Sequence, residues 1–277
     1  MAEDLEFFVR FWGVRGSIAC PGADTLRYGG NTSCLEVRCG KKLLIFDAGT
    51  GLRSFGKQLM TNGTRDADLF LTHTHFDHVC GLPFFAPFFV PDNRFRLWAG
   101  HLGSGLSLEK VLREMLITPL FPVPLDIFKA KMAFNDFRCG ESIDPCREVR
   151  VTTTPLNHPD GATGYRIDFC GKSICYLTDT EHVEGELDAN LLRLIAGADI
   201  VIYDSTYTDE EYPKFKTFGH STWQQCVRLC AAADARTAVI FHHEPDHDDA
   251  FMDRIAAEAE AMRPGTVVAR EGMVLHP

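Results

Sequence analysis

The stretch LFLTHTHFDHVCGL, residues 69–82, places three histidines and an aspartate within six positions, directly after an apolar run. In an extended chain, residues i and i+2 point to the same side, so His73 and His75 can face one metal ion. Asp77 and His78, beyond the bend, can then face a second ion. Imidazole and carboxylate groups are ligands that zinc, manganese and iron accept. Four such groups at this spacing predict a pair of ions, which lie ~3.5–4 Å apart in two-metal sites.

Three further candidate ligands stand where apolar, strand-like runs end. His158 lies in TPLNHPDG, Asp179 in CYLTDT and His242 in VIFHHEP. Because a sheet presents functional groups at the ends of its strands, we expect these residues to meet the histidine cluster at one edge. His243 is the alternative to His242, since adjacent residues of an extended chain face opposite sides.

The composition is that of a folded, acidic protein. The chain has 277 residues, of which 45% are hydrophobic, and a formal net charge of −10. This length buries a full core, and the negative charge disfavours broad nucleic-acid binding, which needs a basic face. No run reaches the ~20 apolar residues of a membrane span, and the N-terminal MAEDLEFFVRFWG lacks the features of a secretory signal. The ten cysteines form no CxxC pair, so we expect free thiols in a cytoplasmic protein without a membrane partner.

The remaining pattern predicts two sheets. Strand-like runs rich in β-branched, aromatic or aliphatic residues cover residues 7–12, 34–39, 43–46, 68–71, 148–153, 164–169, 173–177, 200–203, 237–241, 266–270 and 273–275. Helix-like stretches cover 52–60, 107–116, 188–196, 222–233 and 248–262. Residues 79–90 begin like a helix, which Pro83 and Pro87 shorten or bend. Strands with helices spaced among them in both halves favour an α/β fold of two face-to-face sheets with helices outside. We predict a single domain over residues 1–277, with an apolar, Pro- and Phe-rich insertion around 84–139.

HTHFDH, followed in order by His158, Asp179 and His242, resembles the metal-site pattern of the metallo-β-lactamase superfamily of hydrolases. The resemblance covers nearly the whole chain, and it implies a four-layer αββα sandwich with the site along one sheet edge. It also implies how the ligands divide between two ions. The first ion takes His73, His75 and His158, the second takes Asp77, His78 and His242, and Asp179 bridges them.

Two shorter stretches distinguish branches of that superfamily. GHST at 219–222 and YDST at 203–206 are similar to elements of ribonuclease Z and related phosphodiesterases, although ribonuclease Z usually has glutamate where this chain has Asp204. The resemblance implies that His220, oriented by Asp204, touches the phosphate or the leaving oxygen. We count Asp77, His220 and Asp204 as catalytic residues. GHST also fits a helix start, in which Ser221 or Thr222 caps the helix that follows.

The opening, FWGVRGSIACPG and YGGNTSCLEV, resembles the start of phosphodiesterases near the phosphoribosyl 1,2-cyclic phosphate phosphodiesterases. Arg15, Asn31 and Thr32 are candidates for the surroundings of the site, because Gly-rich loops bring backbone close to ligands. Asp47, in FDAGTG, is expected to be a buried partner of a ligand histidine. His247, in DHDD, is expected at the surface.

These patterns predict a dinuclear metal-dependent phosphodiesterase that hydrolyses a small, cyclic nucleotide or sugar phosphodiester by metal-bound hydroxide. Two divalent ions are implied, zinc first and manganese or iron as alternatives, and a homodimer is allowed. One alternative is a ribonuclease Z-like endonuclease that processes transfer RNA, although the 84–139 segment is apolar rather than a Lys-rich arm. Another is a lactonase or thioesterase, whose chemistry has no need of the GHST and YDST pair.

Overall fold

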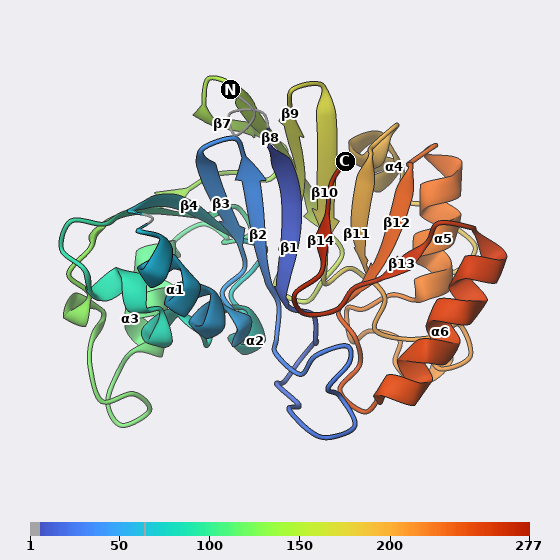
Figure 1. Cartoon of the computed structure of the whole chain (residues 1–277), viewed down its shortest axis with the longest axis horizontal. Helices are drawn as coiled ribbons and strands as arrows, with labels where there is room; N and C mark the ends of the chain where they lie inside the picture. The colour runs from blue at the N-terminus through green and yellow to red at the C-terminus, as the bar shows by residue number, and fades with distance from the viewer. Residues whose placement is uncertain (1–5, 64) are drawn as a thin grey trace.

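The computed structural model describes residues 6–63 and 65–277, in which two seven-stranded sheets pack face to face with helices on their outer faces (Figure 1). This is the α/β sandwich that the sequence predicts. The N-terminal residues 1–5, part of the stretch that lacks signal features, lie outside the described residues. Among the helices that are described, none combines the length and apolar character needed to cross a membrane.

The first sheet is formed mainly by the N-terminal half of the chain, in the order β14-β1-β2-β3-β4-β5-β6. Its strands are β1 (Phe7–Gly13), β2 (Cys34–Cys39), β3 (Lys42–Phe46), β4 (Asp66–Leu71), β5 (Arg94–Ala99), β6 (Lys131–Asp136) and β14 (Val274–Leu275). β3 to β6 pair in parallel, whereas β1 and β2 pair antiparallel with their neighbours. The parallel strands therefore end at one edge.

The second sheet is formed by the C-terminal half, in the order β13-β12-β11-β10-β9-β8-β7. Its strands are β7 (Ser142–Cys146), β8 (Val149–Leu156), β9 (Ala162–Phe169), β10 (Lys172–Leu177), β11 (Ile200–Asp204), β12 (Thr237–Phe241) and β13 (Val267–Val268). β10 to β13 pair in parallel. Their carboxyl ends lie at the same side of the molecule as those of the first sheet, at the bottom of Figure 1.

Helices cover the outer faces of both sheets. α1 (Gly51–Asn62) and α3 (Leu108–Met115) pack on the first sheet, and α4 (Ala189–Ile195), α5 (Trp223–Ala232) and α6 (Asp249–Met262) pack on the second. Their starts follow capping chemistry: Asp188, Thr222 and Asp248 each accept a backbone N–H of the first turn. Ser107 caps α3 in the same way, whereas α1 begins without a side-chain cap. All five predicted helices are confirmed to within two residues at either end.

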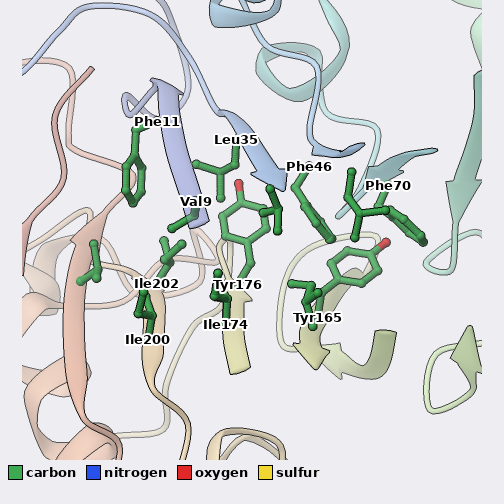
Figure 2. Packing of buried hydrophobic residues seen from close by; sticks show 14 of the residues in the cluster. Val9, Phe11, Leu35, Phe46, Phe70, Tyr165, Ile174, Tyr176, Ile200 and Ile202 are labelled. Carbon is green, nitrogen blue, oxygen red and sulfur yellow. The ribbon is translucent and has the colours of Figure 1, made fainter. Parts of the chain in front are cut away.

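The core between the sheets is rich in aromatic residues, and it reaches the edge where the parallel strands end (Figure 2). The Phe46 ring stacks on Phe70 with 5.3 Å between centroids, and Tyr165 meets Phe46 edge-on at 5.2 Å. Two core tyrosines carry hydroxyl groups, which need hydrogen-bond partners when they are buried. The Tyr165 hydroxyl donates to the carbonyl of Leu71 at 2.5 Å, and the Tyr176 hydroxyl donates to Asp47 at 2.8 Å. The core therefore holds the segments that follow β3 and β4.

The segment predicted as an insertion at 84–139 contributes two strands, β5 and β6, to the first sheet. β5, β6 and β7 were not expected from the sequence, because the Pro and Phe residues around them obscure their alternation. The helix that the sequence predicts from residue 79, shortened or bent by two prolines, does not form. It is replaced by the single turn α2 (Phe76–Val79) and the 3-10 turns η2 (Leu82–Phe84) and η3 (Ala86–Phe89), because Pro83 and Pro87 have no N–H to continue a helix.

Candidate metal centre at the strand ends

Seven histidine and aspartate side chains converge where strands of both sheets end. His73 and His75 follow β4, and Asp77 and His78 lie in α2, so the first sheet supplies four of them. The second sheet supplies three, which follow β8, β10 and β12: His158, Asp179 and His242. Asp179 and His242 have φ values of 59° and 63°, a left-handed backbone that only special surroundings stabilise outside glycine. The strand ends therefore turn sharply and aim these side chains at one centre.

Asp179 lies between two groups of side chains. His73, His75 and His158 form the first group, with candidate ligand atoms within 4.8 Å of one another. Asp179 Oδ1 is 3.7 Å from Nε2 of both His73 and His158. The Nε2 of His158 is also 3.1 Å from Nδ1 of His75.

Asp77, His78 and His242 form the second group, and they face the other oxygen of Asp179. Asp179 Oδ2 is 3.2 Å from Nε2 of His78 and 3.3 Å from Nε2 of His242. Asp77 Oδ2 is 3.2 Å from His78 Nε2 and 3.6 Å from His242 Nε2. The Asp179 carboxylate thus lies within 3.2–3.7 Å of histidines from both groups, and it would be available to both ions.

The chemistry of the donor atoms fits metal ions. Nε2 of His73, His78 and His242 is buried and makes no hydrogen bond among the described residues. Leaving a buried polar atom unpaired costs about 1–3 kcal/mol, so three such atoms around one point require a partner. A pair of metal ions, one for each group, would satisfy all three atoms, because neutral imidazole is a standard ligand of zinc, manganese and iron.

The other ring nitrogen of each of these histidines is held by a neighbour. His78 Nδ1 donates to Asp47 at 2.9 Å. His73 Nδ1 is 3.0 Å from the Thr72 hydroxyl, which itself donates to Asp47. The same arrangement recurs at His242, whose Nδ1 is 3.0 Å from the hydroxyl of Thr206. Partners of this kind fix the ring orientation and the tautomer that directs Nε2 to a metal.

The charges of the buried side chains make the centre suited to binding cations. Burial lowers the pKa of His73 well below its usual value, so its imidazole is neutral. Burial also opposes ionisation of Asp179, but His242 and His78 outweigh it and hold the pKa of that carboxyl well below its usual range. Asp77 is likewise ionised, because the neighbouring histidines lower its pKa despite burial. Burial opposes a positive charge on His78, but the carboxylates of Asp77 and Asp179 outweigh burial and raise the pKa of His78 well above its usual value. These buried carboxylates therefore favour positive charge at the centre, as a cation-binding site does.

A second acid–histidine pair adjoins the centre. Asp204, at the end of β11, is fully buried and accepts a hydrogen bond from Nδ1 of His220 at 2.9 Å. The backbone N–H of Thr180 and Thr206 also donates to this carboxylate, which fixes its orientation. His220 Nδ1 lies 3.9 Å from Asp179 Oδ1. The Asp204 side chain is therefore long enough to reach His220.

Charge and capping both act on His220. Burial opposes its positive charge, but Asp204 outweighs burial and raises the pKa of His220 to about 9. The imidazole is therefore a proton donor at neutral pH. The alternative reading of GHST as a helix start also holds, because Thr222 caps α5 by accepting from the N–H of Gln225 at 3.1 Å. The cap fixes the turn that carries His220.

Of the remaining candidates from the sequence, two lie beside the centre and two lie away from it. Asp47 is the buried partner of His78, as expected. Thr32 lies beside the centre, since its hydroxyl donates to the carbonyl of Asp77 at 2.7 Å. Arg15 points away, and its guanidinium donates to the carbonyls of Gly29 and two other residues. Asn31 is likewise outside the centre, where it binds Glu271.

Two expectations about the last histidines can be compared with the structure. His242 faces Asp77 and Asp179, whereas His243 turns to the opposite side and lies with Nε2 2.8 Å from the carbonyl of Ala269. The expectation that His247 lies at the surface is wrong. It is buried, and its Nε2 is 2.9 Å from Glu211. A histidine in an acidic, loop-like stretch gave no sign of this distant partner.

Several residues around the centre were not found from the sequence. Thr72 and Thr206 hold ligand rings, His101 pairs with Thr74 at 3.1 Å, and His182 pairs with Ser221 at 2.8 Å. Thr72 directly precedes the HTHFDH motif and Thr206 ends YDST, so their position in the motifs was the available signal. His101 and His182 stand in no motif, and only the fold brings them here.

Comparisons with known proteins agree on family and fold. The family described as "Beta-lactamase superfamily domain" matches residues 43–243. Proteins named ribonuclease Z from Bacteroides fragilis and Haloarcula marismortui are each 23% identical, over 84% and 88% of this chain and 89% and 90% of their own. Among solved structures, the metallo-β-lactamase fold protein YhfI from Bacillus subtilis superposes with a TM-score of 0.74 at 17% identity, covering 98% of this chain and 100% of that one. A diphosphatase of the PhnP family gives 0.70 at 20% identity, covering 98% of both chains.

Proposed function

Because the chain belongs to the β-lactamase superfamily, whose domain it matches over residues 43–243, we propose that it is a dinuclear metal-dependent phosphodiesterase. Its substrate in this proposal is a small, cyclic nucleotide or sugar phosphodiester. One observation carries the choice of chemistry: His220, held by Asp204 at 2.9 Å, stands beside Asp179 of the centre. A positioned imidazolium suits a reaction whose leaving group is an alkoxide.

The proposed ligands are those predicted from the sequence. His73, His75 and His158 would hold one divalent ion, Asp77, His78 and His242 the other, and Asp179 both. Zinc is the first choice and manganese or iron the alternatives, because nitrogen and carboxylate ligands suit all three. When bound, such ions polarise phosphoryl oxygens and acidify water, which supplies the nucleophile at neutral pH.

The protein's own residues supply the proton for the substrate and hold the group that donates it in a fixed orientation. Nδ1 of His220 is engaged by Asp204, so the proton available to a substrate is on Nε2. Asp204 keeps the ring charged, and the Thr180 and Thr206 N–H groups keep Asp204 in place. His220 therefore protonates the leaving oxygen or binds a phosphoryl oxygen by a charged hydrogen bond. Help of this kind typically contributes about 10²–10⁴-fold in rate.

A ribonuclease Z-like endonuclease is the second candidate, favoured by the curated relatives of that name, which align with most of this chain. The same His220–Asp204 pair would serve that reaction. Two features favour a small substrate instead. The chain carries a net charge of −10, and the 84–139 segment contributes sheet strands and apolar packing rather than a basic arm.

The test is a panel of substrates with the zinc-, manganese- and iron-loaded enzyme. Cyclic mononucleotides, cyclic sugar phosphates, bis(p-nitrophenyl) phosphate, precursor transfer RNA and a lactone are compared for wild type, His220→Ala and His276→Ala. We expect His220→Ala to lower phosphodiester kcat about 10²–10⁴-fold with unchanged metal content. His276, exposed and outside the centre, is the matched control and should have no effect.

Other results would redirect the proposal. Cleavage of precursor transfer RNA with inert cyclic substrates would favour the endonuclease. Turnover of the lactone alone, unaffected by His220→Ala, would favour the carboxylic-bond hydrolases. A phosphodiesterase that loses less than threefold on His220→Ala would remove His220 from the mechanism.

A further inference from the structure

Two phenylalanines stand exposed in the motifs that build the centre. Phe76, between His75 and Asp77, has 74% of its surface exposed, and Phe218, two residues before His220, has 58%. Single exposed apolar residues are ordinary on protein surfaces, so exposure alone carries nothing. These two differ by position, because each belongs to a segment whose neighbouring residues face the candidate ligands.

Hydrogen bonds place the two segments on either side of one ligand. His158 Nε2 lies 3.1 Å from Nδ1 of His75, the residue before Phe76. His158 Nδ1 donates to the carbonyl of Gly219, the residue after Phe218, at 2.8 Å. The His75 side chain is also 41% exposed, whereas those of His73, His78 and His242 are at most 1% exposed. The centre therefore opens to solvent at His75, beside the His158 side chain, which is itself only 2% exposed. The segments that carry Phe76 and Phe218 border that opening.

The backbone around Phe218 is built to display it. Glu181 accepts the N–H of Thr217 at 2.8 Å and that of Gly219 at 2.9 Å, so one carboxylate clamps both neighbours of Phe218. Both neighbours have left-handed backbone, with φ of 76° at Thr217 and 86° at Gly219. For β-branched threonine this conformation is an outlier, and such strain gathers at functional sites. A Cβ on Gly219 would stand 2.3 Å from His158 Nδ1, so the turn is also pressed against the centre.

Aromatic rings connect this turn to the proton donor. Phe218 meets Phe215 edge-on at 5.9 Å, Phe215 stacks on Tyr207 at 4.5 Å with 7° between planes, and Tyr207 meets His220 at 6.2 Å. The series of rings makes Phe218 the outer end of a packed wall rather than a loose side chain. A rigid apolar wall binds a ring with little loss of conformational entropy.

The charge of the opening restricts the ligand further. Asp160, nearly fully exposed, stands 3.8 Å from Nε2 of His75, and the Glu181 carboxylate lies beneath the Phe218 turn. Carboxylates at the edge repel additional phosphates. The opening therefore disfavours a continuing sugar-phosphate chain and favours an uncharged group.

We propose that Phe76 and Phe218 are specificity-determining residues that stack on a nucleobase-like ring attached to the alcohol of the phosphodiester. This inference rests on the proposed function and names its substrate class: a mononucleotide diester rather than a base-free sugar phosphate. Stacking of a base on an aromatic side chain is sequence-tolerant, so the four bases should differ little. Both residues act by binding the ring, not by touching the reacting atoms.

The test compares two substrates that share a reacting centre. Adenosine 2′,3′-cyclic phosphate carries a base, and methyl riboside 2,3-cyclic phosphate does not. We expect Phe76→Ala and Phe218→Ala each to lower kcat/KM for the adenosine substrate about 5- to 100-fold, mainly through KM, and to leave the methyl riboside within twofold. Phe76→Trp should restore the preference. Phe89→Ala is the matched control, because Phe89 is 42% exposed but packs on Phe128 away from the centre.

The outcomes separate this inference from the proposed function. If both substrates are hydrolysed equally and the variants affect neither, or affect both alike, the stacking role is overturned while the phosphodiesterase stands. If neither substrate is hydrolysed, the proposed function fails, and calorimetry decides the stacking role. Adenosine 3′-monophosphate should then bind more weakly to Phe76→Ala and Phe218→Ala than to the wild type, whereas the affinity for methyl riboside 3-phosphate should be the same in all three proteins. Equal affinity of the wild type and the variants for adenosine 3′-monophosphate would overturn the stacking role.

Discussion

Asp47 connects the aromatic core to the candidate metal centre through one carboxylate. Its Oδ2 accepts hydrogen bonds from His78 Nδ1 and from the hydroxyls of Tyr176 and Thr72. It follows β3 directly and has a left-handed backbone with φ of 57°. The residue therefore transmits the packing of the sheets to the orientation of a ligand ring.

Replacing this carboxylate by an amide tests that role. Asp47→Asn removes the charge that orients His78 while keeping the volume, and we expect metal affinity to fall about 10–100-fold. Competition with a chromophoric chelator measures it. Asp168→Asn, on β9 and paired with Arg166, is the control and should not change affinity. Equal affinity in both variants would show that the charge of Asp47 is not needed to orient the His78 ring.

Gly16 offers a purely steric test at the same scale. A Cβ built on it would stand 2.4 Å from the His242 ring, whereas one built on Gly103 would meet nothing within 4 Å. Gly16→Ala should therefore displace His242 and reduce bound metal to one equivalent or less, measured by elemental analysis. Gly103→Ala should retain two. If Gly16→Ala still binds two equivalents of metal, the loop that carries Gly16 moves to make room for the methyl group and His242 stays in place.

Among the elements, α5 and α6 begin with the same capping chemistry but stand at different distances from the centre. Thr222 accepts the N–H of Gln225, and Asp248 accepts that of Phe251. Removing such a cap typically costs about 1 kcal/mol of stability. Only Thr222 lies next to the turn that carries His220.

We expect Thr222→Ala and Asp248→Ala to lower the free energy of unfolding by similar amounts, about 0.5–2 kcal/mol in denaturant titrations. Activity should separate them. Thr222→Ala should reduce phosphodiester turnover, by up to about 100-fold if His220 moves by 1 Å, and Asp248→Ala should not. If both variants keep full activity, the cap does not position His220.

For the whole molecule, the centre joins the two sheets, because four candidate ligands come from the first and three from the second. Metal removal should therefore destabilise the entire sandwich. At ion concentrations of 100 times Kd, binding contributes about 2.7 kcal/mol, so a strong chelator should lower Tm by about 5–10 °C in calorimetry. His78→Ala should show little change on chelation. If the chelator does not change the Tm of the wild-type protein, ion binding at this site is contradicted.

At this scale, much of the fold could be predicted from the sequence, and the reasons are local. The apolar runs that end near His158, Asp179 and His242 predict strands whose ends share one edge. The capping residues Asp188, Thr222 and Asp248 predict where helices begin. β5 and β6 were missed because Pro and Phe residues around them hide the strand pattern. The pairing of His247 with Glu211, and the turn of Arg15 away from the centre, depend on contacts between distant segments. The ligand roles themselves stay predictions, since proximity is not coordination.

The crossover between the sheets has a practical consequence. β6 is an edge strand of the first sheet and β7 an edge strand of the second, so residues 137–141 join two segments that each carry an incomplete set of ligands. A cut there would leave neither fragment able to build the pair of ion sites alone. Turnover would then return only on reassociation, which makes this sandwich a natural scaffold for a split reporter of molecular proximity.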